Sequence, residues 1–154
     1  MATSSLEVWD TIAGEAAQES DLWAEALLPS DQRELVAVFS PLVDEQFALG
    51  VETIYEAYLV HFGRPRLFGI ADSNTSILLG DYLYAHGLVR IAETGDVDAV
   101  AALSDLISTC ARLRAEGLPG DGEAWAETAL RLGDGAADQG DVERALAAHV
   151  LRLS

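Results

Sequence analysis

The sequence contains no lysine, and its nine basic residues are all arginines, against 26 aspartates and glutamates. The formal net charge is −17 at pH 7. A chain without lysine cannot form a Schiff base through a side-chain amine. Nucleic-acid binding needs clustered cations that neutralise phosphates, so this charge balance predicts no nucleic-acid partner.

Cysteine is also scarce, and long apolar runs are lacking. Cys110 is the only cysteine, so no disulfide can form within the chain, and we expect a small buried side chain on an apolar helix face. The first thirty residues carry several acids, without a basic start or an apolar run. We therefore expect no signal peptide, no integral membrane segment and a cytoplasmic location.

Residue types that build catalytic or metal sites are present without the required spacing. The three histidines are scattered singly, and we assign no catalytic residue, no cofactor and no metal ligand. The densest acids are Asp134, Asp138 and Asp141, set among glycines. We favour an ordinary acidic loop over a Mg²⁺ or Ca²⁺ site, because the EF-hand spacing and its closing glutamate are missing.

Apolar residues recur at three- and four-residue steps, and no segment alternates as a strand would. This periodicity predicts an all-α fold, a single-domain bundle of six to seven helices. A chain of 154 residues is long enough for its own core. We divide it into N-terminal helices (residues 1–40), core helices (41–116) and shorter C-terminal helices (117–154).

Local signals predict where several helices begin and end. We expect one helix over residues 4–28, or two with a break near Ser20 and Asp21. Ser30 is a good cap for a short helix after it, which would hold Leu35, Val36, Val38 and Phe39. Ser40 and Pro41 predict the start of a third helix that runs to about Phe62. The C-terminal helices are expected over residues 123–133 and 142–153, with Asp141 as the cap of the second.

Residues 75–116 predict two long antiparallel helices joined by a tight turn at Gly95 and Asp96. Gly80 lies inside the first of them, where glycine costs about 1 kcal/mol relative to alanine. We expect a neighbouring backbone to approach it closely. Asp81 would then need a partner such as an arginine or a hydroxyl group.

The segment ILLGDYLYA (residues 77–85), with AETGD (92–96) and ALS (102–104), resembles the central helices of trans-polyprenyl diphosphate synthases. The resemblance is greatest to the small, non-catalytic component of two-component heptaprenyl- or hexaprenyl-type synthases. It implies a truncated isoprenoid-synthase fold. It also implies a catalytic large subunit as partner, which would carry both aspartate-rich motifs and the Mg²⁺ ions.

The motifs of an active synthase have no counterpart here. Where the first aspartate-rich motif belongs, the chain has Asp44 and Glu45, and then Glu52 and Glu56 among apolar residues. A solvated pair near a helix start accounts better for Asp44 and Glu45 than metal binding does. The lysine-containing diphosphate clamp of the family is missing as well.

The resemblance suggests which residues line a cavity or an interface. Gly80 and Asp81 would mark the helix beside the chain-elongation cavity, and Tyr82 and Tyr84 would wall the channel for a prenyl chain. The full set of cavity or interface candidates is Gly80, Asp81, Tyr82, Tyr84, Tyr55, Tyr58 and Phe62.

Arg64 and Arg66 form the only basic cluster, just before this helix. They superficially resemble the arginine-rich diphosphate loop of active relatives and could contact an anion. The alternative is a helix-ending loop whose cations lie near a helix C-terminus.

These features predict a non-catalytic subunit of a heteromeric trans-polyprenyl diphosphate synthase that helps to define the prenyl-chain cavity. The alternative is a helical adaptor or homodimeric interaction module without prenyl chemistry. An enzyme that acts alone ranks third.

Overall fold

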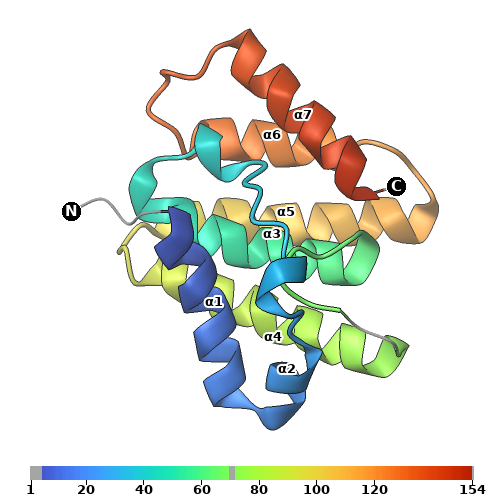
Figure 1. The fold of residues 1–154 in the computed structure, drawn as a ribbon. Helices are drawn as coiled ribbons and strands as arrows, with labels where there is room; N and C mark the ends of the chain where they lie inside the picture. Colours follow the sequence, from blue (N-terminus) through green and yellow to red (C-terminus); the bar gives the residue numbers. More distant parts are fainter. Residues whose placement is uncertain (1–4, 70–71, 154) are drawn as a thin grey trace.

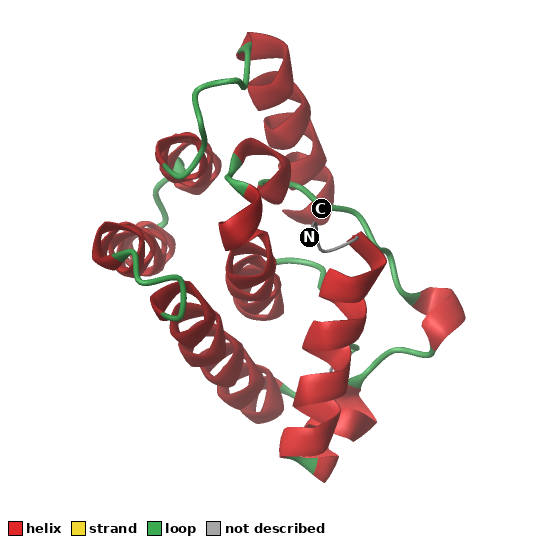
Figure 2. Ribbon diagram, turned by 90° about the vertical axis from the view of Figure 1, so that its left-hand side faces the viewer, coloured by secondary structure: helices red, strands yellow, loops and turns green. Residues whose placement is uncertain are grey.

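The computed structural model describes residues 5–69 and 72–153, with the backbone alone for residues 5 and 6. Every α-helix and 3₁₀ turn in these ranges belongs to one all-α bundle, as predicted, and Figure 2 shows only helices and loops there. The α-helices are α1 (Ser5–Glu19), α2 (Asp21–Ala26), α3 (Ala48–Phe62), α4 (Ser73–Ala92), α5 (Val97–Glu116), α6 (Asp121–Arg131) and α7 (Gln139–Leu153). Three 3₁₀ turns lie between α2 and α3: η1 (Ser30–Gln32), η2 (Ser40–Leu42) and η3 (Glu45–Phe47).

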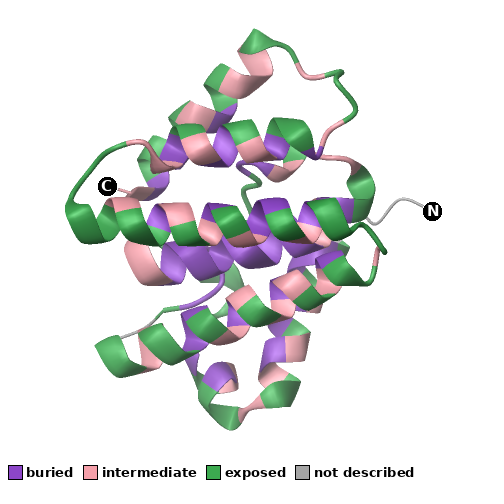
Figure 3. Cartoon of the chain, turned by 180° about the vertical axis from the view of Figure 1, so that it is seen from behind, coloured by how far each residue is buried: buried purple, intermediate pink, exposed green. Residues whose placement is uncertain are grey.

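Helix α3 lies at the centre of the bundle (Figure 1). Every residue from 50 to 60 is buried. A helix that is buried all round must be covered on every side. Helices α1, α4 and α7 and the turns η2 and η3 contact it, and the central band of buried residues is visible from behind in Figure 3.

The core has two parts, on either side of α3. One part joins α3 to α5, α6 and α7 and contains Trp125. The other joins α3 to α1, α2 and α4 and contains Trp9 and Trp23. All three tryptophans are buried, so they belong to the core rather than to an interface.

Glycines let α3 and α4 pack closely. A Cβ atom added to Gly50 would lie 3.3 Å from the Gly87 carbonyl oxygen, and one added to Gly87 would lie 3.2 Å from the Gly50 carbonyl oxygen. The two backbones therefore meet at this glycine pair. At Gly80, where we expected a backbone, the close neighbour is a side chain: an added Cβ would lie 2.3 Å from His61 Nε2.

The predicted hairpin is confirmed as α4 and α5. Asp96 caps α5, its side chain accepting a hydrogen bond from the Ala99 amide at 2.9 Å, and Gly95 has a φ of 82° in the turn. The cap of α4 is Asp72, whose carboxylate accepts a hydrogen bond from the Thr75 amide.

The segment before α3 differs from the prediction. Beyond η1, residues 33–39 are not helical, and α3 begins at Ala48 instead of Pro41. Long-range hydrogen bonds hold this segment: the Glu34 amide donates to the Arg66 carbonyl oxygen, and the Asp44 amide donates to the Leu132 carbonyl oxygen. Local capping signals could not anticipate either bond.

At the start of α7, Asp138 takes the capping role predicted for Asp141. The Asp138 carboxylate accepts from the Asp141 amide, and the Asp141 carboxylate accepts from the Asp138 amide, both at 2.9 Å. This reciprocal pair satisfies two backbone donors at the helix start.

None of the described helices is sufficiently long and apolar to cross a membrane.

Candidate functional site

The strongest concentration of interior charge surrounds Arg66, which follows α3 in the loop to α4. Its side chain is fully buried between two carboxylates from successive turns of α3, Glu52 and Glu56. Arg66 Nε donates to Glu56 at 3.0 Å, and Arg66 Nη1 donates to both Glu52 and the Val36 carbonyl oxygen. The guanidinium lies 4.5 Å from the centre of the Trp9 ring.

Glu56 is saturated with hydrogen bonds. Besides the guanidinium, it accepts from the backbone amides of Arg66 and Leu67 at 2.9 and 2.8 Å. Glu52 has fewer hydrogen bonds, because its buried Oε1 has no partner. The cluster therefore ties the loop after α3 to the helix and to residue 36, and Arg66 has no free face for an external anion.

The sequence prediction did not identify this buried ion-pair cluster, although the spacing of its two glutamates indicates it. Glu52 and Glu56 are four residues apart, which places them on one face of a helix, within the most apolar stripe of the chain. Carboxylates at such positions are almost never fully buried unless they are paired.

Arg64 occupies a different environment, at the surface. It pairs with Glu34 at 3.1 Å and donates to the Leu151 carbonyl oxygen, and its side chain is half-exposed. Arg152 from α7 pairs with the same glutamate at 3.1 Å. An anion at Arg64 would have to compete with Glu34.

The aromatic candidates on α3 face this chain's own core. Tyr55 and Tyr58 are fully buried and stacked on one another, with ring centres 5.8 Å apart, and Phe62 packs partly buried beside them. Tyr55 and Tyr58, expected to line a cavity or an interface, are covered by α6 and α7 of this chain. Trp125 of α6 contacts both tyrosine rings edge-on.

Tyr58 belongs to a hydrogen-bonded trio that joins α3, α5 and α6. Its hydroxyl donates to Asp121 and accepts from Arg114 Nη2 at 2.8 Å, while Arg114 Nε donates to Asp121 at 2.9 Å. Burial alone would raise the pKa of Asp121, but the Tyr58 hydroxyl and the Arg114 guanidinium hold it below its usual value. The trio therefore keeps Asp121 ionised at the start of α6.

His149 of α7 is buried against the same aromatic cluster. Its Nδ1 forms a hydrogen bond with the Tyr55 hydroxyl at 2.7 Å, and its buried Nε2 has no partner. Burial lowers the pKa of His149 below 6.5. The side chain is accordingly neutral in the folded chain at pH 7.

The candidates on α4 are distributed around the helix. Gly80 is buried, whereas the Asp81 side chain is 67% exposed and lies 3.4 Å from His61 Nε2. The partner of Asp81 is therefore a partly buried histidine rather than the expected arginine or hydroxyl group. Tyr84 stacks on His61, with ring centres 5.2 Å apart.

Tyr82 lies on the α1 side of α4 and is partly buried. It stacks on His86, with ring centres 5.4 Å apart, and contacts Trp23. His86 and Arg90 both pair with Glu15 of α1, whose pKa is lowered chiefly by the His86 hydrogen bond. These contacts attach α1 to α4.

The acidic residues considered as metal ligands form hydrogen bonds with nearby backbone amides. Asp134 accepts a hydrogen bond from the Ala136 amide, and Asp138 and Asp141 form the reciprocal cap of α7. Within residues 5–69 and 72–153, no group of three histidines, cysteines or acids is arranged to hold a metal ion. Cys110 is buried as expected, and burial raises the pKa of its thiol to about 12.

The outer face of α4 carries exposed apolar residues that no described element covers. Three large apolar side chains are exposed on this face: Ile77 (52%), Leu78 (56%) and Val89 (52%). Ala85, between Leu78 and Val89, and Ala92, beyond Val89, are exposed as well. Leu78, Ala85, Val89 and Ala92 follow seven-, four- and three-residue steps, so they form one stripe along the helix. We call these four residues, with Ile77 at their edge, the α4 stripe.

No family model matches this chain, and neither the curated proteins nor the solved structures include a significant match.

Proposed function

We propose that this chain is a non-catalytic subunit that binds a catalytic partner, and that the partner is the large subunit of a trans-polyprenyl diphosphate synthase. The observation that carries the proposal is the α4 stripe. It lies on the helix that bears residues 77–85, the segment that resembles the synthases.

The geometry of the stripe suits helix-on-helix docking. Single exposed apolar residues are common, but an aligned set on one helix marks an interaction surface. Ala85, between the larger Leu78 and Val89, and Ala92, beyond Val89, are small, so a partner helix could approach α4 closely at these two positions. The stripe also has the three- and four-residue spacing through which amphipathic helices are recognised.

Charge around the stripe indicates the kind of partner. Asp81 on α4 and Glu93, directly after its last residue, are both exposed, and the chain as a whole carries a net charge of −17. A second copy would bring the same negative charge to the contact, whereas a partner with basic residues around an apolar centre would be attracted. In this proposal the large subunit supplies the carboxylate ligands, the Mg²⁺ and the diphosphate-binding cations.

One observation favours the alternative, an adaptor without prenyl chemistry. The four tyrosines among the cavity or interface candidates already pack against this chain's own rings. Tyr55 and Tyr58 stack on each other, and Tyr82 and Tyr84 stack on His86 and His61. A prenyl tail could therefore meet this chain only along an outer face such as the α4 stripe.

Co-expression with a catalytic large subunit of a two-component synthase tests both proposals. The expected result is a heteromer on size-exclusion chromatography and Mg²⁺-dependent condensation of isopentenyl diphosphate that requires both chains. A complex without condensation would support the adaptor, and the absence of a complex would overturn the proposed subunit.

A matched pair of variants tests the surface. Val89→Glu places a charge in the α4 stripe and should weaken the complex about tenfold or more. Val150→Glu places the same charge on α7, where Val150 is 63% exposed, and should leave the complex unchanged. Equal loss from both variants would exclude the α4 stripe as the docking surface.

A further inference from the structure

A second surface lies at the end of the molecule away from α4. A hollow of about 610 Å³ lies between residues 37–45, which lead into α3, and the segment of residues 134–148 that contains the start of α7. Figure 1 places α7 and α4 at opposite ends of the bundle, and Figure 3 shows the same separation from behind.

The base of the hollow is apolar. Its buried lining residues are Val38, Leu42 and Ala145, which are 2, 4 and 5% exposed. Ala148, partly buried one turn further along α7, continues the apolar lining. An apolar group of a ligand could contact these residues.

The edge of the hollow is acidic. Four carboxylates line it, from Asp44, Glu45, Asp134 and Asp141, against one guanidinium, that of Arg144. Arg144 is already paired with Asp141. In the part of the chain that the structure describes, the carboxylates of Asp44 and Glu45 have no hydrogen bond or ion pair, so they are available to a ligand.

We propose that this hollow binds a short basic segment of a partner protein, with an apolar side chain placed between arginines or lysines. The apolar base would receive the apolar side chain, and Asp44 and Glu45 would pair with the flanking cations. The volume is in the range of pockets that hold a few side chains. A second copy of this chain fits poorly, because its net charge is also −17.

This inference does not depend on the proposed synthase partner. It uses a different surface, and the Val89→Glu variant of the α4 stripe should not affect it.

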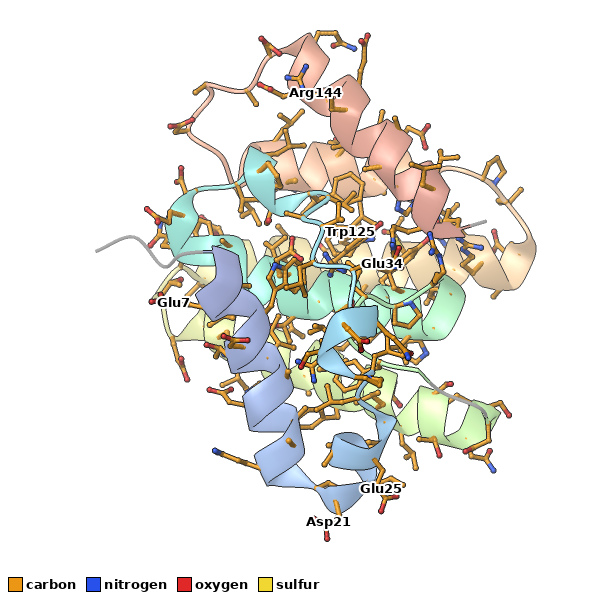
Figure 4. All side chains as sticks on the ribbon, viewed as in Figure 1. Glu7, Asp21, Glu25, Glu34, Trp125 and Arg144 are labelled. Carbon is orange, nitrogen blue, oxygen red and sulfur yellow. The ribbon has the colours of Figure 1, made fainter. Side chains whose placement is uncertain are left out.

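Binding of a short fluorescein-labelled peptide that alternates arginine and leucine, measured by fluorescence anisotropy at physiological salt, tests the proposal on the full chain. The double variant Asp44→Asn, Glu45→Gln should weaken binding about tenfold. The control Asp21→Asn, Glu25→Gln removes the same charge from α2, at the other end of the molecule (Figure 4), and should change affinity by less than about twofold. Replacing leucine with serine in the peptide should also weaken binding, because the apolar base would lose its contact.

Equal weakening by the two double variants would show unspecific charge attraction and would overturn the proposal, as would unchanged binding of the serine peptide. A second measurement needs no variant. Addition of the arginine–leucine peptide should shift the backbone amide resonances of Ala137, Ala145 and Ala148 more than those of Asp21 and Glu25. Shifts spread evenly over the chain would contradict a site in the hollow.

Discussion

At the scale of single residues, the fold depends on one buried cation. Arg66 is fully buried and balances carboxylates on two turns of α3, and Trp9 of α1 covers it. A buried ion pair is not in itself stabilising relative to apolar residues, but removing one member leaves an uncompensated charge in the core. Here the loss would leave two carboxylates facing each other.

Arg66→Met should therefore lower the free energy of unfolding by about 3–5 kcal/mol. Urea denaturation followed by circular dichroism would measure it. The control is Arg64→Met two residues earlier, where a half-exposed surface pair is lost and the expected change is below about 1 kcal/mol. Similar losses from both variants would mean that the cluster contributes no more than a surface pair.

At the scale of elements, the contact between α3 and α4 depends on glycines rather than on large side chains. Gly50 and Gly87 bring the two backbones together, and Gly80 makes room for His61. Glycine weakens an isolated helix, so its presence at buried positions of α3 and α4 indicates that packing decided these positions.

Two glycine substitutions separate helix propensity from packing. Gly87→Ala would place a Cβ 2.5 Å from Ile54 Cγ1 and should destabilise the protein by about 1–3 kcal/mol, despite the better helix former. Gly14→Ala in α1 meets nothing within 4 Å and should stabilise it by up to about 1 kcal/mol. Thermal unfolding of both variants would measure this, and a stabilised Gly87→Ala protein would contradict the close crossing.

Helices whose signals are local in the sequence could be predicted, and the segment before α3 could not. The α4–α5 hairpin and its Asp96 cap follow from apolar spacing and a capping aspartate, both of which are local. The prediction for the segment before α3 failed because hydrogen bonds to Arg66 and Leu132, distant in sequence, hold residues 33–47. Leu35 and Val36, predicted to line a helix, are 41 and 48% exposed.

At the scale of the whole molecule, acid should destabilise the fold through two histidines. Burial lowers the pKa of His149 and of His61 below the usual value of 6.5. Below pH 6.5 the unfolded chain therefore binds more protons than the folded chain, so the free energy of unfolding falls as the pH falls. The contribution of these two histidines should level off once the pH is below their pKa values in the folded chain.

Urea midpoints of the wild type and of His149→Asn between pH 7.5 and pH 5 would test this. The variant removes one titrating group, so its stability should change less across this range than that of the wild type. The comparison cancels the effect of the remaining charges, which is common to both proteins. A wild type whose stability changes no more than that of the variant would contradict a neutral, buried His149.

The sequence alone determined the helical class, the hairpin and the absence of lysine chemistry. Periodicity and helix caps depend on neighbouring residues, and composition depends only on how many residues of each type the chain contains. Only the tertiary structure decided which charges are buried and which apolar faces stay open. Arg64 and Arg66 are two positions apart in one loop, yet one is at the surface and the other is fully buried. That difference arises from carboxylates on α3 and a tryptophan on α1, whose positions in space no local pattern specifies.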